Sequence, residues 1–379
     1  MTTFYPFAME QMMSEFEQDV DYNLSESGAH PISLRELLGD DPQELQRLLD
    51  TELNYPYVNG IPELRKNISA LYDGASADNV LVTVGAAEAN YITTRTLLSA
   101  GDEIVVMLPN YMQIWGIARN HGYHLKAFHL REDRGWAPDL EELERAVTPD
   151  TKLIAVCNPD NPTGYILSEE EMDAIVAVAA RAGAWILADE VYGGAERLTD
   201  AQTPSFYGRY DRVVATNSTS KAYGLPGLRL GWVVGPEDTV KDIWRRHEYT
   251  TISATALSNR LGALALSPQV RPRLLQRTRQ YIRRGFPLLQ QWMEQHGDTF
   301  HFTPPQAAAV AFVRYDLDVN STAFAERLRQ EKSVLIVPGD HFGMDHLLRI
   351  SFGLPHDDLV GGLERIHELV VELQAERQT

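Results

Sequence analysis

Short apolar runs alternate with segments of helical periodicity through the middle of the chain, and this alternation limits the fold more than any other feature. The runs contain few polar residues, as strands require when helices cover both faces of their sheet. We expect strands at Asn79–Val84, Glu103–Leu108, Lys152–Cys157, Ala184–Ala188, Val213–Thr216 and Leu230–Val234. Because strand–helix–strand units cross over in the right-handed sense, the pattern predicts an α/β fold with a doubly wound, mostly parallel sheet.

Two of the intervening helices carry end signals. Pro62 occupies a first helical position, and Gly74 is the expected stop of that helix. Ser168 and Glu171 have the spacing of a capping box, which predicts a second helix start.

The pattern changes after about residue 275. A basic helical stretch, Arg277–Arg284, leads to two strand candidates, Val310–Arg314 and Val334–Val337, and the chain closes on an amphipathic helix. We therefore expect a large α/β domain over residues 46–275 that binds the cofactor. A small α+β domain would follow over residues 276–379, and residues 1–45 would pack with it.

Charge and cysteine content narrow the class of protein. The chain of 379 residues has 34 Lys+Arg against 53 Asp+Glu, a net charge of −19, which argues against nucleic acid and anionic membranes as partners. No apolar stretch approaches the roughly 18 residues of a membrane span. One cysteine, Cys157, and an acidic N-terminus without a signal-peptide pattern favour a reducing, cytoplasmic location. His341 and His346 lack metal-site spacing, so we expect no metal.

A small-residue turn that opens a helix follows the first of the expected strands, and polar or aromatic side chains follow four others, at the strand ends where an open parallel sheet binds its ligands. In chain order they are Gly85, Ala86 and Ala87, then Tyr111, then Asn161, then Asp189 and Tyr192, then Ser218, Ser220 and Lys221, with Arg229 further on. An aldehyde cofactor with a pyridine ring and a phosphate needs an amine, a carboxylate for the ring nitrogen, and hydroxyl, guanidinium and helix N–H groups for the phosphate. Taken singly, each motif has an ordinary reading as a turn, a helix cap or a core aromatic. No Gly-rich dinucleotide or P-loop motif is found.

Four segments resemble one family. NPDNPTG (158–164), DEVY (189–192), STSKAYGLPGLRLGW (218–232) and LLRISFG (347–353) are similar to the class I/II aminotransferases, pyridoxal-phosphate enzymes of fold type I. The resemblance runs from about residue 50 to the C-terminus. It implies pyridoxal 5'-phosphate as the cofactor, an amino acid as the substrate and, for transamination, a 2-oxo acid as the acceptor.

The resemblance also implies residue roles. Lys221 would be the Schiff-base lysine and the base that moves the Cα proton, and Asp189 would pair with the ring nitrogen. Asn161 and Tyr192 would bond the ring hydroxyl, and Tyr111 would stack on the ring.

Further roles concern the phosphate, the substrate and the subunit contact. The phosphate would be held by Gly85, Ala86, Ala87, Ser218, Ser220 and Arg229. The substrate would be held by Arg349, which clamps its α-carboxylate, and by Asn161, Ser27 and Gly28. Tyr55 matches the tyrosine that reaches the phosphate of a neighbouring subunit, which implies a homodimer.

The reaction itself stays open between two alternatives. Tyr22–His30 lacks the glycine-rich entry motif followed by Pro-Asp, and with VPGDHFG (337–343) it is more similar to the capreomycidine synthase-like branch, which dehydrates and cyclises a hydroxylated arginine. We expect an aminotransferase, with a cyclising or eliminating lyase as the alternative. Glu10 and Glu26 are either solvated surface acids or partners of a cationic substrate side chain. A ligand-sensing regulator is disfavoured because no helix-turn-helix pattern precedes the matching region.

Overall fold

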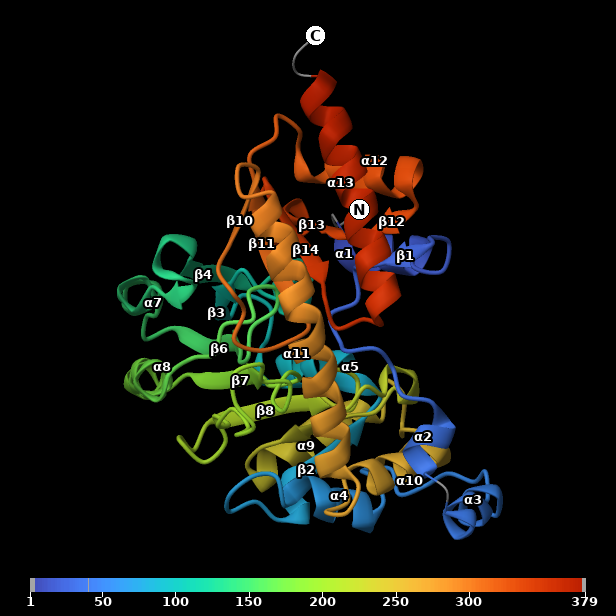
Figure 1. The fold of residues 1–379 in the computed structure, drawn as a ribbon. Coiled ribbons are helices and arrows are strands. Elements are labelled where there is room, and N and C mark those ends of the chain that lie inside the picture. Colours follow the sequence, from blue (N-terminus) through green and yellow to red (C-terminus); the bar gives the residue numbers. More distant parts are fainter. Residues whose placement is uncertain (1–3, 40, 377–379) are drawn as a thin grey trace.

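The computed structural model describes residues 4–39 and 41–376, and its largest element is a central eight-stranded sheet (Figure 1). The strand order is β2-β9-β8-β7-β6-β3-β4-β5. The bounds are β2 Val80–Thr83, β3 Glu103–Leu108, β4 His124–Arg131, β5 Ala137–Pro138, β6 Thr151–Cys157, β7 Trp185–Asp189, β8 Val213–Ser218 and β9 Gly231–Val234. Strands β4, β3, β6, β7 and β8 are parallel, whereas β9 is antiparallel to both β2 and β8. The predicted α/β fold with a mostly parallel sheet is therefore confirmed.

Helices cover both faces of this sheet, which explains the continuous apolar runs. Along β3, Val105 and Met107 pack in one cluster with α7 and α8, while Ile104 and Val106 pack in another with α5, α6 and α9. The helix bounds are α4 Pro62–Ser69, α5 Gly85–Leu97, α6 Gln113–Asn120, α7 Leu140–Ala146, α8 Glu169–Ala182, α9 Glu237–His247 and α10 Ala256–Ala265, with 3₁₀ turns η1 Ala77–Asn79, η2 Glu132–Arg134 and η3 Pro226–Leu228.

The predicted helix signals are confirmed at the N-terminal ends. Ser168 and Glu171 form the expected capping box of α8, and Pro62 stands in the first turn of α4. The expected stop at Gly74 is wrong, because α4 ends at Ser69 and the chain then continues through turns before η1.

A second, antiparallel sheet lies above the central one in Figure 1, and the long helix α11 connects the two. The strand order of this second sheet is β10-β11-β14-β13, with bounds β10 Phe300–Phe302, β11 Val310–Tyr315, β13 Val337–Pro338 and β14 Leu347–Ser351. The helices of this part are α11 Arg271–Gln295, α12 Ser321–Lys332 and α13 His356–Glu376, with the 3₁₀ turn η4 Gly339–Phe342.

The predicted single strand Val334–Val337 is wrong. Val334–Leu335 forms β12, which pairs with β1, and β13 starts at Val337 in the four-stranded sheet. Since the run is apolar throughout, the sequence does not show that the chain changes partners at Ile336.

The N-terminal region folds into α1 Ala8–Phe16, β1 Tyr22–Asn23, α2 Leu34–Leu38 and α3 Pro42–Leu49. Strand β1 is parallel to β12, and Met9 and Met13 of α1 share an apolar cluster with Phe342 and Leu347. Helix α11 is continuous through residues 275 and 276, so the division into three segments stays a prediction. Over the two described ranges, no helix is long and apolar enough to cross a membrane.

Candidate active site

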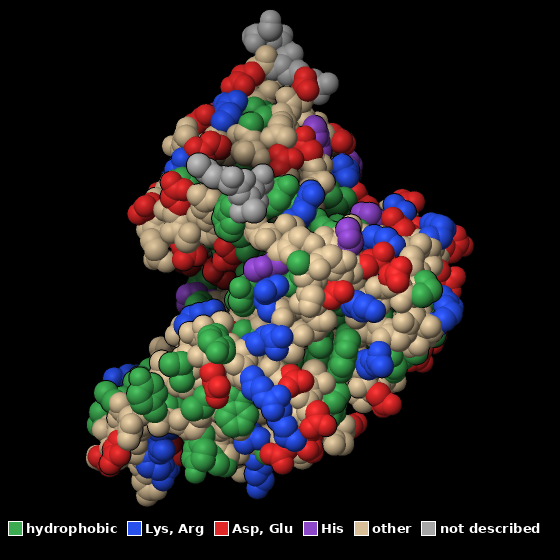
Figure 2. Space-filling view, turned by 180° about the vertical axis from the view of Figure 1, so that it is seen from behind, with side chains coloured by type: hydrophobic (Ala, Val, Ile, Leu, Met, Phe, Trp, Pro, Cys, Tyr) green, Lys and Arg blue, Asp and Glu red, His purple; other side chains and the backbone are tan. Residues whose placement is uncertain are grey.

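A cavity of about 360 Å³ lies at the carboxyl ends of the central strands and reaches Arg349 of the small sheet. Figure 2 shows the molecule hollowed at its left edge, between the part with the small sheet and the part with the central sheet, with acidic side chains gathered above the hollow. Twelve of the predicted site residues line this cavity: Ser27, Ala86, Ala87, Tyr111, Asn161, Asp189, Tyr192, Ser218, Ser220, Lys221, Arg229 and Arg349. The structure thus brings together side chains that the sequence places up to about 320 residues apart.

Lys221 follows β8 and faces the N-terminal segment across the cavity. Its Nζ lies 3.5 Å from Oε2 of Glu26, which is half-buried. The Lys221 ammonium holds the pKa of the Glu26 carboxyl below its ordinary value. Gly28 stands behind the lysine, since a Cβ on Gly28 would lie 3.5 Å from Lys221 Cδ. The amine is therefore held between its own strand end and residues 26–28.

Asp189 is the last residue of β7, and its carboxylate is buried at the floor of the cavity. Burial raises the pKa of this carboxyl, while hydrogen bonds from Asn90 Nδ2 (2.8 Å) and the Val191 N–H (3.2 Å) act in the opposite direction. These donors help to keep the buried carboxylate ionised, and an ionised carboxylate can accept a hydrogen bond from a protonated ring nitrogen.

The start of α5 lies at one end of the cavity, which Ala86 and Ala87 line. Its first residues carry no side-chain cap, so their N–H groups are left to a ligand. Gly85 has φ +76°, a backbone conformation that favours glycine, and a Cβ there would lie 2.6 Å from Nη2 of Arg229, so a larger residue would also push the guanidinium away. Gly231 packs as closely from the other side, because its Cβ would lie 2.3 Å from the Gly85 carbonyl carbon.

Arg349 of β14 is the buried cation of the cavity, with 2% of its surface exposed. Its Nη1 donates to Asn161 Oδ1 at 3.0 Å, and its Nη2 donates to the Ser25 carbonyl. Its Nε has no hydrogen-bond partner among the described residues. Since an unpaired buried guanidinium N–H is costly, this group calls for an acidic ligand.

Two phenols complete the lining. Tyr192 donates to Ser27 Oγ at 2.7 Å, and burial raises its pKa. Tyr111 donates to Glu10 Oε1 at 2.8 Å and contacts Phe7, with ring centroids 5.0 Å apart. Helix α1 is thereby fixed above the cavity, and Glu10, Met13, Ser14 and Glu17, which share one face of the helix, line it.

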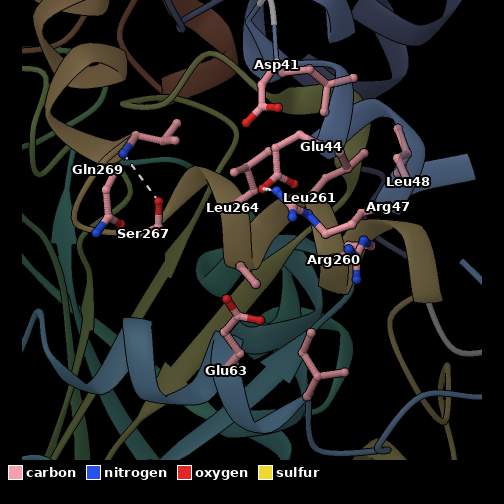
Figure 3. A pocket seen from close by; sticks show the side chains of 14 residues that line it. Asp41, Glu44, Arg47, Leu48, Glu63, Arg260, Leu261, Leu264, Ser267 and Gln269 are labelled. Atoms are coloured by element: carbon pink, nitrogen blue, oxygen red, sulfur yellow. Dashed lines mark hydrogen bonds and ion pairs between the residues drawn. The ribbon is translucent and has the colours of Figure 1, made fainter. Parts of the chain in front are cut away.

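Tyr55 is the one predicted residue that stands apart from this site. It is 79% exposed and lines none of the cavities near Lys221, so its role toward a second subunit stays a prediction. A larger cavity, of about 550 Å³, lies between α3, α4 and α10 (Figure 3). It shares no residue with the site around Lys221 and carries only a mixture of charged and apolar side chains, among them Glu63 and Arg260.

Several residues of the site were not found from the sequence. Asn90 and Glu17 line the cavity without having been singled out. Glu10 and Glu26, expected as either surface acids or partners of a cationic side chain, both line the cavity, and Glu26 pairs with Lys221. The helical spacing of Glu10, Met13, Ser14 and Glu17 was the available signal for α1. Cys157, predicted as inert core, is buried with its pKa raised by burial, yet it also reaches the cavity wall. Within residues 4–39 and 41–376, no group of three or more His, Cys, Asp or Glu is arranged to hold a metal ion.

The donor set of the cavity fits one cofactor. An amine, a buried carboxylate, and an uncapped helix start with two serines and an arginine match the aldehyde, the ring nitrogen and the phosphate of pyridoxal 5'-phosphate. Fold and site therefore define a pyridoxal-phosphate-dependent enzyme of fold type I.

Comparisons with known proteins agree and give the family. The family model "Aminotransferase class I and II" matches residues 34–366. Capreomycidine synthase of Streptomyces vinaceus is 32% identical over 356 residues, 91% of this chain and 89% of that protein. An aspartate aminotransferase of Streptomyces avermitilis is 30% identical, over 84% of this chain and 82% of that protein. The chain belongs to the class I and II aminotransferase family.

Solved structures show the same relationship. A PLP-dependent aminotransferase from Streptococcus suis superposes with a TM-score of 0.92 at 30% identity, over 98% of this chain and 99% of that one. The PLP-dependent cyclase OrfR superposes with a TM-score of 0.87 at 27% identity, over 98% of both chains. Relatives of this fold thus include both aminotransferases and cyclases.

Proposed function

We propose that this enzyme transfers the α-amino group of an amino acid to a 2-oxo acid. The observation that carries the proposal is Arg349, a buried guanidinium with an unpaired Nε in the same cavity as Lys221 and Asp189. A carboxylate bound to Arg349 would orient the substrate so that its Cα meets the amine of Lys221.

Each side chain has a distinct task in this proposal. Pyridoxal 5'-phosphate supplies an aldehyde for the substrate amine and a ring that withdraws electrons from Cα. Lys221 removes the Cα proton as a general base and returns it as a general acid. Asp189 keeps the ring nitrogen protonated, and Asn161 with Tyr192 bonds the ring hydroxyl. Ala86, Ala87, Ser218, Ser220 and Arg229 hold the phosphate.

A second candidate function is dehydration and cyclisation of a hydroxylated, arginine-like amino acid, which the resemblance to the capreomycidine synthase-like branch implies; a capreomycidine synthase is among the relatives. The carboxylates of Glu10, Glu17 and Glu26 favour it, because all three line the cavity, where they would attract a cationic substrate side chain. Burial and, to a smaller extent, repulsion by Glu26 raise the pKa of Glu17, and a cationic side chain would lower it again.

One experiment separates the two functions. The purified holoenzyme is mixed with single amino acids in the absence of any 2-oxo acid, and the cofactor spectrum is recorded with the products. Stoichiometric conversion to the pyridoxamine form supports amino transfer, whereas loss of water or ammonia with the aldehyde retained supports the lyase. Lys221→Ala is the control that abolishes both. Glu10→Gln and Glu26→Gln test the preference for the substrate side chain. Unchanged selectivity for basic amino acids in both variants would show that these carboxylates do not select the substrate.

We also propose a cytoplasmic homodimer. Apolar and aromatic side chains are exposed in and beside α2 and α3, and hydrophobic side chains gather at the lower left of Figure 2. They are Leu34, Leu45, Leu49, Leu53, Tyr55 and Tyr57. Light scattering should give twice the chain mass of 42.6 kDa, and Tyr55→Ala should weaken cofactor binding if Tyr55 serves the second subunit.

A further inference from the structure

Asn90 lies behind Asp189, in the second turn of α5, and is 1% exposed. Its Nδ2 donates to Asp189 Oδ2 at 2.8 Å and to Gln113 Oε1 at 3.2 Å. Its Oδ1 accepts from the Thr216 hydroxyl at 2.7 Å. Both N–H bonds and the carbonyl are therefore engaged, which fixes the amide in one orientation.

This amide stands between the two ends of the cofactor site. Gln113 also donates to the Ala87 carbonyl at 2.8 Å, so a continuous chain of hydrogen bonds joins the first turn of α5 to Asp189. Thr216 is on β8, beside Asp189 in the sheet register. Asn90 is thus held on one side through Gln113 from the first turn of α5, and on the other side by Thr216 of β8.

The hydrogen bond that Asn90 donates changes how Asp189 would share a proton with the ring nitrogen of the cofactor. A proton between a carboxylate and a ring nitrogen resides on the group with the higher proton affinity. Burial raises the proton affinity of Asp189, and a hydrogen bond donated to the carboxylate lowers it. Without Asn90, the balance would move toward a protonated acid and a neutral ring, which withdraws electrons poorly from Cα.

We propose that Asn90 is a positioning residue that holds Asp189 ionised and thereby keeps the proton on the cofactor's ring nitrogen. In this role Asn90 acts through the carboxylate of Asp189. The inference rests on the proposed pairing of Asp189 with the ring nitrogen.

The test is the protonation state of the ring. Apoenzyme is reconstituted with ¹⁵N-labelled pyridoxal 5'-phosphate, and the nitrogen chemical shift is followed against pH without substrate. In Asn90→Leu the ratio of protonated to neutral ring nitrogen should fall about ten- to hundredfold at pH values below the loss of the shared proton, seen as a shifted plateau of the nitrogen signal, since a hydrogen bond to a charged group is worth about a ten- to hundredfold change in equilibrium. Affinity for the cofactor should fall by a smaller factor.

A matched control lies one turn further along the same helix. Thr93 is fully buried, and its hydroxyl has no hydrogen-bond partner among the described residues, so Thr93→Val changes a buried polar residue of α5 without removing a bond. It should titrate as the wild type does. Asn90→Ala removes the amide without adding bulk and replaces the leucine variant if that protein is not recovered folded.

The outcomes distinguish the two proposals. If Asn90→Leu or Asn90→Ala titrates like Thr93→Val while Asp189→Ala loses the ring proton, the role of Asn90 is refuted and the role of Asp189 stands. If Asp189→Ala leaves the ring protonated as in the wild type, the pairing of Asp189 with the ring is refuted, and the inference about Asn90 with it.

Discussion

Replacement of Gly231 by alanine tests the phosphate end of the site. Gly231 opens β9, where it pairs with Thr83 on one side and Ser218 on the other. A Cβ at this position would lie 2.3 Å from the Gly85 carbonyl carbon and 2.5 Å from the Ala86 nitrogen. Carbon atoms in contact are about 3.5–4.0 Å apart, so β9 or the turn before α5 must move by more than about 1 Å.

Such a shift is enough to break hydrogen bonds to a phosphate. An N–H···O bond of about 2.9 Å stretched by about 1 Å is no longer a hydrogen bond. Each such bond to a charged group contributes about 1.5–3 kcal/mol, so losing one of them weakens cofactor binding by roughly ten- to a hundredfold. The dissociation constant of pyridoxal 5'-phosphate, measured by titrating the apoenzyme and following cofactor absorbance, should rise by that factor.

A control is available on the loop before Arg229. Gly227 has no atom within 4 Å of a built Cβ and no positive φ, so Gly227→Ala should bind the cofactor as the wild type does. Gly231→Ala with an unchanged dissociation constant and melting temperature would refute the account of this turn.

Three further substitutions test other parts of the molecule. Arg349→Lys keeps the charge but loses the planar fork, so steady-state kinetics should show KM for the amino acid raised about ten- to a hundredfold, with a smaller change in kcat. Burial raises the pKa of Asp160 to about 7, above its unfolded value, so the folded state holds a proton between about pH 4 and 7 and loses stability as pH rises through that window. Asp160→Asn should remove up to about 1.4 kcal/mol per pH unit from the slope of unfolding free energy there, measured in urea at several pH values, and an unchanged slope would contradict the assignment. Arg279→Met leaves the buried carboxylate of Glu196 without its cation and should cost about 3–5 kcal/mol in denaturant unfolding. Glu196→Gln in the same chain should recover part of this loss, because it removes the unpaired charge and keeps an acceptor for the Gly194 and Thr203 N–H groups.

The central sheet was predictable because each of its buried strands is apolar on both faces. Strand β4 was missed for the opposite reason, since its sequence HLKAFHLR carries charged and polar residues toward the edge of the sheet. The site residues at the strand ends could be predicted together, because parallel strands deliver whatever follows them to one edge.

Residues that reach the site from elsewhere were harder to predict. Arg349 was identified only through the family resemblance, since it comes from a strand of the second sheet. Asn90 gave no signal, because one asparagine within a helix is ordinary until its partners are known. Helix α1 is short, and its apolar side is carried by Met9 and Met13 while Glu10 and the C-cap residue Glu17 line the cavity, so its pattern is too brief to stand out in the sequence.

The pairing of β1 with β12 has a consequence for how the enzyme is made. Tyr22–Asn23 leaves the ribosome about 300 residues before its partner Val334–Leu335, roughly 15–60 s earlier at about 5–20 residues per second. Until the partner has emerged, the segment that carries Glu10 and Glu26 has no strand to dock against. Nascent chains arrested before residue 334 should therefore leave this segment, whose Glu26 meets Lys221 in the folded enzyme, open to proteolysis.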